Sequence, residues 1–182
     1  WAFHADGKLK WVSPLPDSGK PFVYQIISKQ GYVGGITVDG KVLFYHRHNG
    51  KLALPIFRLP KGVSPAKGPD LPGLWQGGLF HESVIELFKQ IAFGYKVQVA
   101  NAPAVHPETG RVFITASGPK DGKALSGVLY GLDIKESGVE IGFATKMGGG
   151  SGTSPALSAD ASVVYSADGV GQMLAVDTST GK

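Results

Sequence analysis

The sequence predicts an all-β fold made of repeated four-stranded antiparallel units. Short apolar segments alternate with turns along most of the chain, and 27 glycines and 12 prolines among 182 residues supply the turn positions. Glycines that close hairpin turns recur at positions 7, 50, 138 and 181, with spacings of 43, 88 and 43 residues. A period near 43 residues with about four strands per unit is typical of β-propeller blades.

The C-terminal unit carries the clearest copy of the repeat. It predicts strands at 154–158, 163–166 and 173–177, and Thr180-Gly181-Lys182 then forms the turn into a fourth strand. The same order recurs upstream at 102–105, 111–115 and 128–133, followed by Ser137-Gly138. A weaker copy places strands at 35–38 and 41–45 before Asn49-Gly50, and residues 6–11 are a last remnant. Glycine suits each closing turn because it adopts positive φ with little strain.

The double-length gap predicts an insertion at residues 55–94, made of a Pro/Gly-rich loop and an amphipathic helix. Apolar residues at positions 84, 85, 87, 88 and 91 follow a helical stripe, and Gly94 suits the residue after a helix end. Gly94 also falls 44 residues from both neighbouring turn glycines, so a degenerate blade is the alternative.

The segment from Leu174 to Lys182 resembles the tryptophan-docking repeat of the pyrroloquinoline-quinone (PQQ) type of β-propeller. Ala175, Asp177 and Thr180-Gly181-Lys182 match that pattern, and Gly7-Lys8 followed by Trp11 matches its second half. The middle copies are degenerate: Gly131 and Asp133 stand for the Ala and Asp, His46 stands at the Asp position, and Phe143 and Leu54 stand near the Trp position. The resemblance implies that residues 1–182 form about three to four blades of an incomplete ring. It also implies that the ring at the Trp position packs between blades, and that a Phe there keeps the burial but loses the hydrogen bond.

Composition excludes several classes of function. There is no cysteine, which removes disulfides and cysteine-based catalysis or metal binding. The net charge is +4 with single, scattered basic residues, so no nucleic-acid-binding arm is predicted. No apolar stretch approaches the roughly 20 residues of a membrane-spanning helix.

The glycine-rich stretch before the last unit is the candidate cofactor site. In one interpretation, its backbone at Gly149, Gly150, Ser151 and Thr153 forms a nest for an anion or a quinone carboxylate. Close packing of chains near the ring axis is the alternative that the same residues allow.

Histidines offer a weaker candidate. His46 and His48 share one face of a strand, and a metal would need a third ligand such as Asp39 or His4; a solvated turn is the alternative, and no metal site is predicted. His106 is expected in a turn rather than in an acid–base pair.

The predicted insertion is the candidate partner surface, through Leu74, Trp75, Phe80 and Phe88, because long insertions in repeat folds project from one face. For Trp75 the alternative is an anchor that holds the loop to the blades. Trp1 is expected in the core or between blades.

The resemblance favours a non-catalytic scaffold that binds proteins of the bacterial cell envelope, in the periplasm or another extracytoplasmic compartment. A larger envelope or membrane-associated complex is the expected kind of partner. No cofactor is predicted. The alternatives are a quinoprotein dehydrogenase that uses PQQ and calcium, and a propeller that binds carbohydrates or small molecules. No catalytic residue of the dehydrogenases matches a motif here, so none is assigned.

Overall fold

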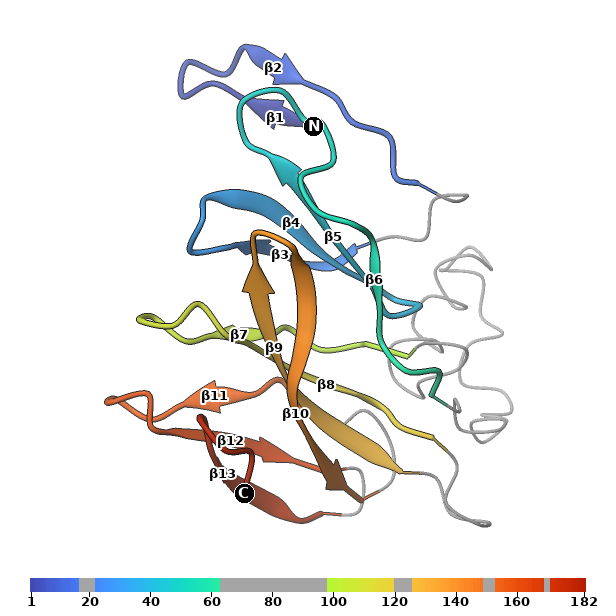
Figure 1. Cartoon of the computed structure of the whole chain (residues 1–182), viewed down its shortest axis with the longest axis vertical. Helices are drawn as coiled ribbons and strands as arrows, with labels where there is room; N and C mark the ends of the chain where they lie inside the picture. The colour runs from blue at the N-terminus through green and yellow to red at the C-terminus, as the bar shows by residue number, and fades with distance from the viewer. Residues whose placement is uncertain (17–21, 63–97, 120–125, 149–152, 169–170) are drawn as a thin grey trace, which may run out of the picture.

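Antiparallel β-sheets make up the secondary structure of the chain wherever the structure, a computed structural model, describes it: residues 1–16, 22–62, 98–119, 126–148, 153–168 and 171–182. These ranges contain no helix, and hence none able to cross a membrane. Their strands form four sheets, which follow one another in chain order along the long axis of the molecule (Figure 1). The all-β prediction is therefore confirmed.

Within each sheet the strands lie in sequence order. The first sheet pairs β1 (Ala2–Phe3) with β2 (Leu9–Trp11). The second contains β3 (Phe22–Ile27), β4 (Tyr32–Thr37), β5 (Lys41–His46) and β6 (Phe57–Arg58). The third contains β7 (Ala104–Val105), β8 (Val112–Ser117), β9 (Gly127–Lys135) and β10 (Gly138–Met147). The fourth contains β11 (Ala156–Leu157), β12 (Val163–Ala167) and β13 (Met173–Asp177).

Most strands that the repeat predicted are present, and several elements, β3 and β6 among them, go beyond the predicted ranges. The strand β3 was not predicted, because its apolar run carries no repeat glycine to mark its place. The strand β6, at Phe57–Arg58, lies inside the predicted insertion and pairs with β5 as the outer strand of the second sheet. The predicted helix, and the degenerate blade that was its alternative, fall on residues outside the described ranges.

The turn glycines give the sheets a common phase. Gly7, Gly50 and Gly181 have positive φ of 81°, 68° and 75°. They follow β1, β5 and β13, which therefore occupy equivalent positions in their sheets. The turns at Gly50 and Gly181 have the same hydrogen-bond pattern. The His46 N–H donates to the Lys51 carbonyl in one turn, and the Asp177 N–H donates to the Lys182 carbonyl in the other. The strands β1, β5, β9 and β13 therefore hold the third position of a four-stranded unit, and β2, β6 and β10 hold the fourth.

Neighbouring sheets pack face to face. One apolar cluster joins the second sheet, through Ile26, Ile36 and Phe44, to Val112 and Ile114 of the third. A second cluster joins the third sheet to the fourth, through Phe113, Leu129, Phe143, Val164 and Val176. The burial of these side chains is the main source of cohesion between the sheets.

The chain leaves and re-enters the described structure at one place. Before residue 63, the Leu59 N–H donates to the Gly40 carbonyl, and after residue 97 the Gln98 N–H donates to the Val38 carbonyl. The Gln98 side chain also donates to the Pro60 carbonyl at 2.5 Å. The second and third sheets are in direct contact beside these flanks, so no sheet of the described residues lies between them.

Candidate functional site

One contact is repeated between neighbouring sheets. An aromatic side chain from the fourth strand of one sheet packs against the glycine turn that follows the third strand of the next sheet. Trp11 of β2 donates its indole N–H to the Arg47 carbonyl at 3.0 Å. Its ring lies so close to Gly50 that a Cβ added there would stand 2.6 Å from a ring atom. The register places Ala2 opposite Trp11, and such a small side chain leaves room for the ring to lie across the strand.

Phe143 of β10 makes the corresponding contact between the third and fourth sheets. It is 9% exposed and lies opposite Gly131 in the register. A Cβ added at Gly131 would stand 2.5 Å from the Phe143 ring, and one added at Gly181 would stand 2.4 Å from it. The ring is thus enclosed by two glycines, one from its own sheet and one from the next turn.

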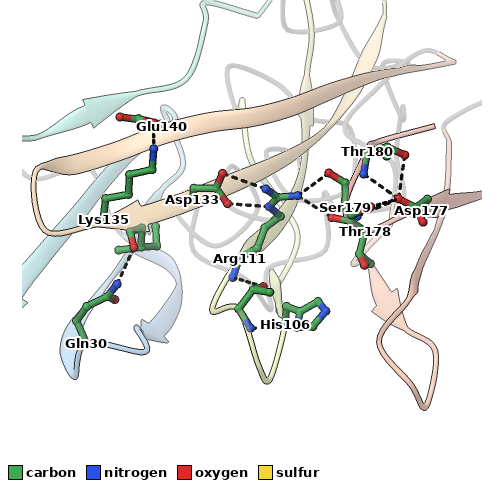
Figure 2. A network of polar contacts seen from close by, with 12 residues as sticks. Gln30, His106, Arg111, Asp133, Lys135, Glu140, Asp177, Thr178, Ser179 and Thr180 are labelled. Atoms are coloured by element: carbon green, nitrogen blue, oxygen red, sulfur yellow. Dashed lines mark hydrogen bonds and ion pairs between the residues drawn. The ribbon is translucent and has the colours of Figure 1, made fainter.

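Arg111 supplies the hydrogen bond that a phenylalanine cannot make. Its Nη1 donates to the carbonyls of Thr178 and Ser179 at 2.8 and 3.0 Å, as Figure 2 shows. Thr178 stands three residues before Gly181, as Arg47 stands three residues before Gly50, so the Arg111 guanidinium and the Trp11 indole bond to equivalent carbonyls. The guanidinium carbon also lies 5.7 Å from the centre of the Phe143 ring, within cation–π range.

Asp133 fixes Arg111 in this position. The pair is bidentate, with Nε to Oδ1 at 2.7 Å and Nη2 to Oδ2 at 3.0 Å (Figure 2). A bidentate guanidinium–carboxylate pair has a defined orientation, unlike a lysine ammonium. Phe143, Arg111 and Asp133, which we call the docking triad, therefore join the third and fourth sheets.

Asp177 stands at the same repeat position as Asp133 but closes its own turn. Hydrogen bonds from the Ser179 hydroxyl, the Thr180 N–H and the Thr180 hydroxyl lower the pKa of Asp177 to about 2. The carboxylate thereby holds the Thr180-Gly181 turn in the shape that receives the Phe143 ring.

A cavity of about 450 Å³ lies between the first and second sheets. Apolar side chains line most of it, including Trp1, Phe3 and Ile27, and Lys10 and Arg47 add two cations. Tyr45 also borders it, is 6% exposed, and has a hydroxyl with no hydrogen-bond partner among the described residues. Burial of that hydroxyl raises the pKa of Tyr45.

The candidate cofactor residues are described only at Thr153. Its N–H donates to the Ala167 carbonyl, its hydroxyl accepts the Ala167 N–H, and its carbonyl accepts the Thr115 hydroxyl. Thr153 thus joins the third and fourth sheets through its own backbone. Gly149, Gly150 and Ser151 lie outside the described residues, so the anion nest stays a prediction.

The histidine pair makes local contacts. His46 packs edge-on against Tyr32, and the Nε of Arg47 donates to His48 at 3.1 Å. In the described part of the chain no three His, Asp or Glu side chains gather as metal ligands. His106 accepts the N–H groups of Glu108 and Thr109 within a turn, which confirms that prediction.

One prediction about tryptophan is wrong. Trp1 is 79% exposed rather than part of the core, because only β2 pairs with the short strand that follows it. The proposed partner residues Leu74, Trp75, Phe80 and Phe88 lie outside the described residues. Sequence reasoning missed Arg111 and the cavity beside Tyr45. For Arg111 the available signal was the Phe at position 143, which, unlike Trp11, has no N–H to donate to the next turn. Comparison with family models and with curated proteins found no match.

Proposed function

We propose that the chain is a segment of a β-propeller of the PQQ-like repeat type. The observation that carries the proposal is the repeated docking of a ring on the next closing turn, by Trp11 on Gly50 and by Phe143 on Gly181. The residues opposite both rings, Ala2 and Gly131, are small, as is the Ala of the repeat pattern. The common phase of the four sheets supports the same architecture.

We propose further that this segment serves as a protein-binding scaffold of the bacterial cell envelope. The proposal rests on the resemblance to the repeat. It is also supported by the polar side chains between the third and fourth sheets, which bond to the two sheets and not to a substrate site. Arg111 and Asp133 satisfy each other and the next turn, and Thr153 bonds to both neighbours. The predicted insertion at residues 55–94 is the proposed partner surface, and the described residues on either side of 63–97 meet at one edge of the sheets.

Crosslinking in isolated bacterial envelopes tests this function. The chain is compared with a variant in which Leu74, Trp75, Phe80 and Phe88 are replaced by serine, and with a control in which the exposed Tyr165 is replaced by serine. We expect a discrete crosslinked partner that the fourfold variant loses and the control keeps. Identical crosslinks in all three proteins would refute the partner surface. A quinone absorption band after addition of PQQ and calcium, with dye-linked alcohol or sugar oxidation, would refute the scaffold in favour of the dehydrogenase.

A further inference from the structure

The turns of the four sheets form one face of the molecule. Because the strands of each sheet are antiparallel and lie in sequence order, the turns after the first and the third strand lie at the same end of the sheet. The turns between β3 and β4, β7 and β8, and β11 and β12 lie along the left side of Figure 1. Neighbouring turns are also in contact, since the Lys29 side chain donates to the Glu108 carbonyl and the Gln30 side chain donates to the Ile134 carbonyl. We call this surface the turn face; it consists of residues 4–8, 28–31, 46–51, 106–110, 135–138, 158–162 and 177–182.

The charge of the turn face changes sign along the row of sheets. The turns of the first and second sheets, residues 4–8, 28–31 and 46–51, carry four cations and one anion, namely Lys8, Lys29, Arg47, Lys51 and Asp6. The turns of the third and fourth sheets carry two cations and four anions, namely Lys135, Lys182, Glu108, Glu136, Asp160 and Asp177. All these residues are exposed. We call the turns of the first two sheets the cationic turns.

Most of the positive charge on the cationic turns is not neutralised within the described chain. Lys8 pairs with Asp6 at 3.3 Å. No carboxylate of the described residues forms an ion pair with Lys29, Arg47 or Lys51. Three exposed cations of the second sheet are therefore available to an anionic partner.

Neutral groups hold Arg47 in place. Its Nε donates to Nε2 of His48 at 3.1 Å, and its carbonyl accepts the Trp11 indole N–H at 3.0 Å. Its guanidinium lies over the neighbouring turn, where a Cβ added at Gly31 would stand 3.6 Å from Nη1. Neither Nη nitrogen has a hydrogen-bond partner among the described residues. A guanidinium held in this way loses less freedom on binding, and its two Nη groups suit the two oxygens of a carboxylate.

We propose that the cationic turns bind an acidic segment of another protein. The change of sign along the turn face favours this partner over other polyanions. A membrane surface or a nucleic acid carries negative charge over its whole extent, so the acidic turns of the third and fourth sheets would repel it. A short acidic segment contacts the cationic turns alone.

Strand spacing sets the pattern of acidic residues that fits. The turn that contains Lys29 and the turn that contains Lys51 are two strand spacings apart, which is about 10 Å. An extended peptide covers that distance in about three residues. Acidic side chains at every third position of an extended segment therefore match the two turns.

Fluorescence anisotropy with a labelled peptide of three Glu-Gly-Ser repeats tests the binding. We expect saturable binding that weakens as salt is added, and no binding of a peptide of Lys-Gly-Ser repeats. Absence of binding to the Glu peptide, or equal binding of the two peptides, would overturn the proposal.

Two double variants separate a local site from the effect of net charge. Arg47→Gln with Lys51→Gln removes two cations from the cationic turns, and Lys135→Gln with Lys182→Gln removes two from equivalent turns of the third and fourth sheets. We expect the first pair to weaken peptide binding by about tenfold and the second by less than about twofold. Melting temperatures establish that both variants fold. Equal weakening would show that net charge alone attracts the peptide, and would overturn the site.

Carbodiimide coupling locates the site in the unaltered chain. The reagent joins a peptide carboxylate to a nearby lysine amine, and mass spectrometry identifies the lysine. We expect coupling at Lys29 and Lys51 and little at Lys135 and Lys182. Coupling spread equally over the four would overturn the proposal even if the variants failed to fold.

Vesicles that contain phosphatidylglycerol and a single-stranded oligonucleotide test the choice of partner. We expect both to bind more weakly than the Glu peptide. Tighter binding of either, lost in the variant of Arg47 and Lys51, would show that the partner is a uniform polyanion and would overturn the acidic segment. The inference does not rest on the proposed envelope role, because the crosslinking test of that role depends on other residues, in the predicted insertion.

Discussion

The contact of Phe143 with the Gly181 turn can be measured by adding a single methyl group. Gly181→Ala places a Cβ 2.4 Å from the ring and also puts alanine at a φ of 75°. The backbone part of this cost is about 1–2 kcal/mol. Displacing a ring in a close-packed contact adds about 1–3 kcal/mol. Gly171→Ala isolates the backbone part, because Gly171 has a φ of 91° in the same sheet and nothing lies within 4 Å of the added Cβ.

Urea unfolding followed by tryptophan fluorescence and circular dichroism provides the assay. We expect Gly181→Ala to lose about 1–3 kcal/mol more unfolding free energy than Gly171→Ala, and its Tm to fall by a further ~2–12 °C for a chain of this size. Equal losses of unfolding free energy in the two variants would refute the reasoning, because they would show that the Phe143 ring does not pack closely against Gly181.

Three further predictions concern the polar groups. Arg111→Lys loses the bidentate pair and should cost about 1–3 kcal/mol of unfolding free energy, whereas Lys135→Met, which breaks a solvent-exposed pair with Glu140, should cost less. Adding Phe143→Trp to Arg111→Met should restore part of the unfolding free energy that Arg111→Met loses, because the indole N–H can donate to the same turn. If it restores none, the indole and the guanidinium do not substitute for each other. The pKa of Asp177 falls from 3.8 to about 2 on folding, so its stabilising contribution is complete above pH ~4 and is lost as the pH falls through 2. Asp177→Asn should flatten that part of the stability–pH profile, and an unchanged profile would contradict the assigned hydrogen bonds. Tyr45→Phe removes a buried hydroxyl without a partner among the described residues. It should leave the unfolding free energy unchanged or raise it by up to about 1 kcal/mol. A fall in unfolding free energy would show that the hydroxyl is hydrogen-bonded.

Features encoded locally were predictable from the sequence. The turns at Gly50 and Gly181 depend on positive φ and on side chains within four residues. Within the described ranges, the Asp177 carboxylate accepts hydrogen bonds from its own turn alone. The repeat spacing also predicted that Phe143 would pack as a ring between neighbouring units, and it lies between Gly131 and Gly181. The role of Arg111 was not predictable, because its partners stand 22 and 67 residues away in the sequence. No local pattern brings a guanidinium, a carboxylate and a distant carbonyl together.

The sequence by itself determined the all-β class, the repeat phase and the residues that close each turn, because these depend on φ and on the alternation of side chains over a few residues. Tertiary structure alone decided which sheets touch, that Trp1 is exposed, and that Arg111 bonds to the turn carbonyl equivalent to the one that Trp11 contacts. These depend on packing between segments far apart in the chain, where burial of apolar surface sets the arrangement and each polar group then bonds to whatever partner that arrangement supplies.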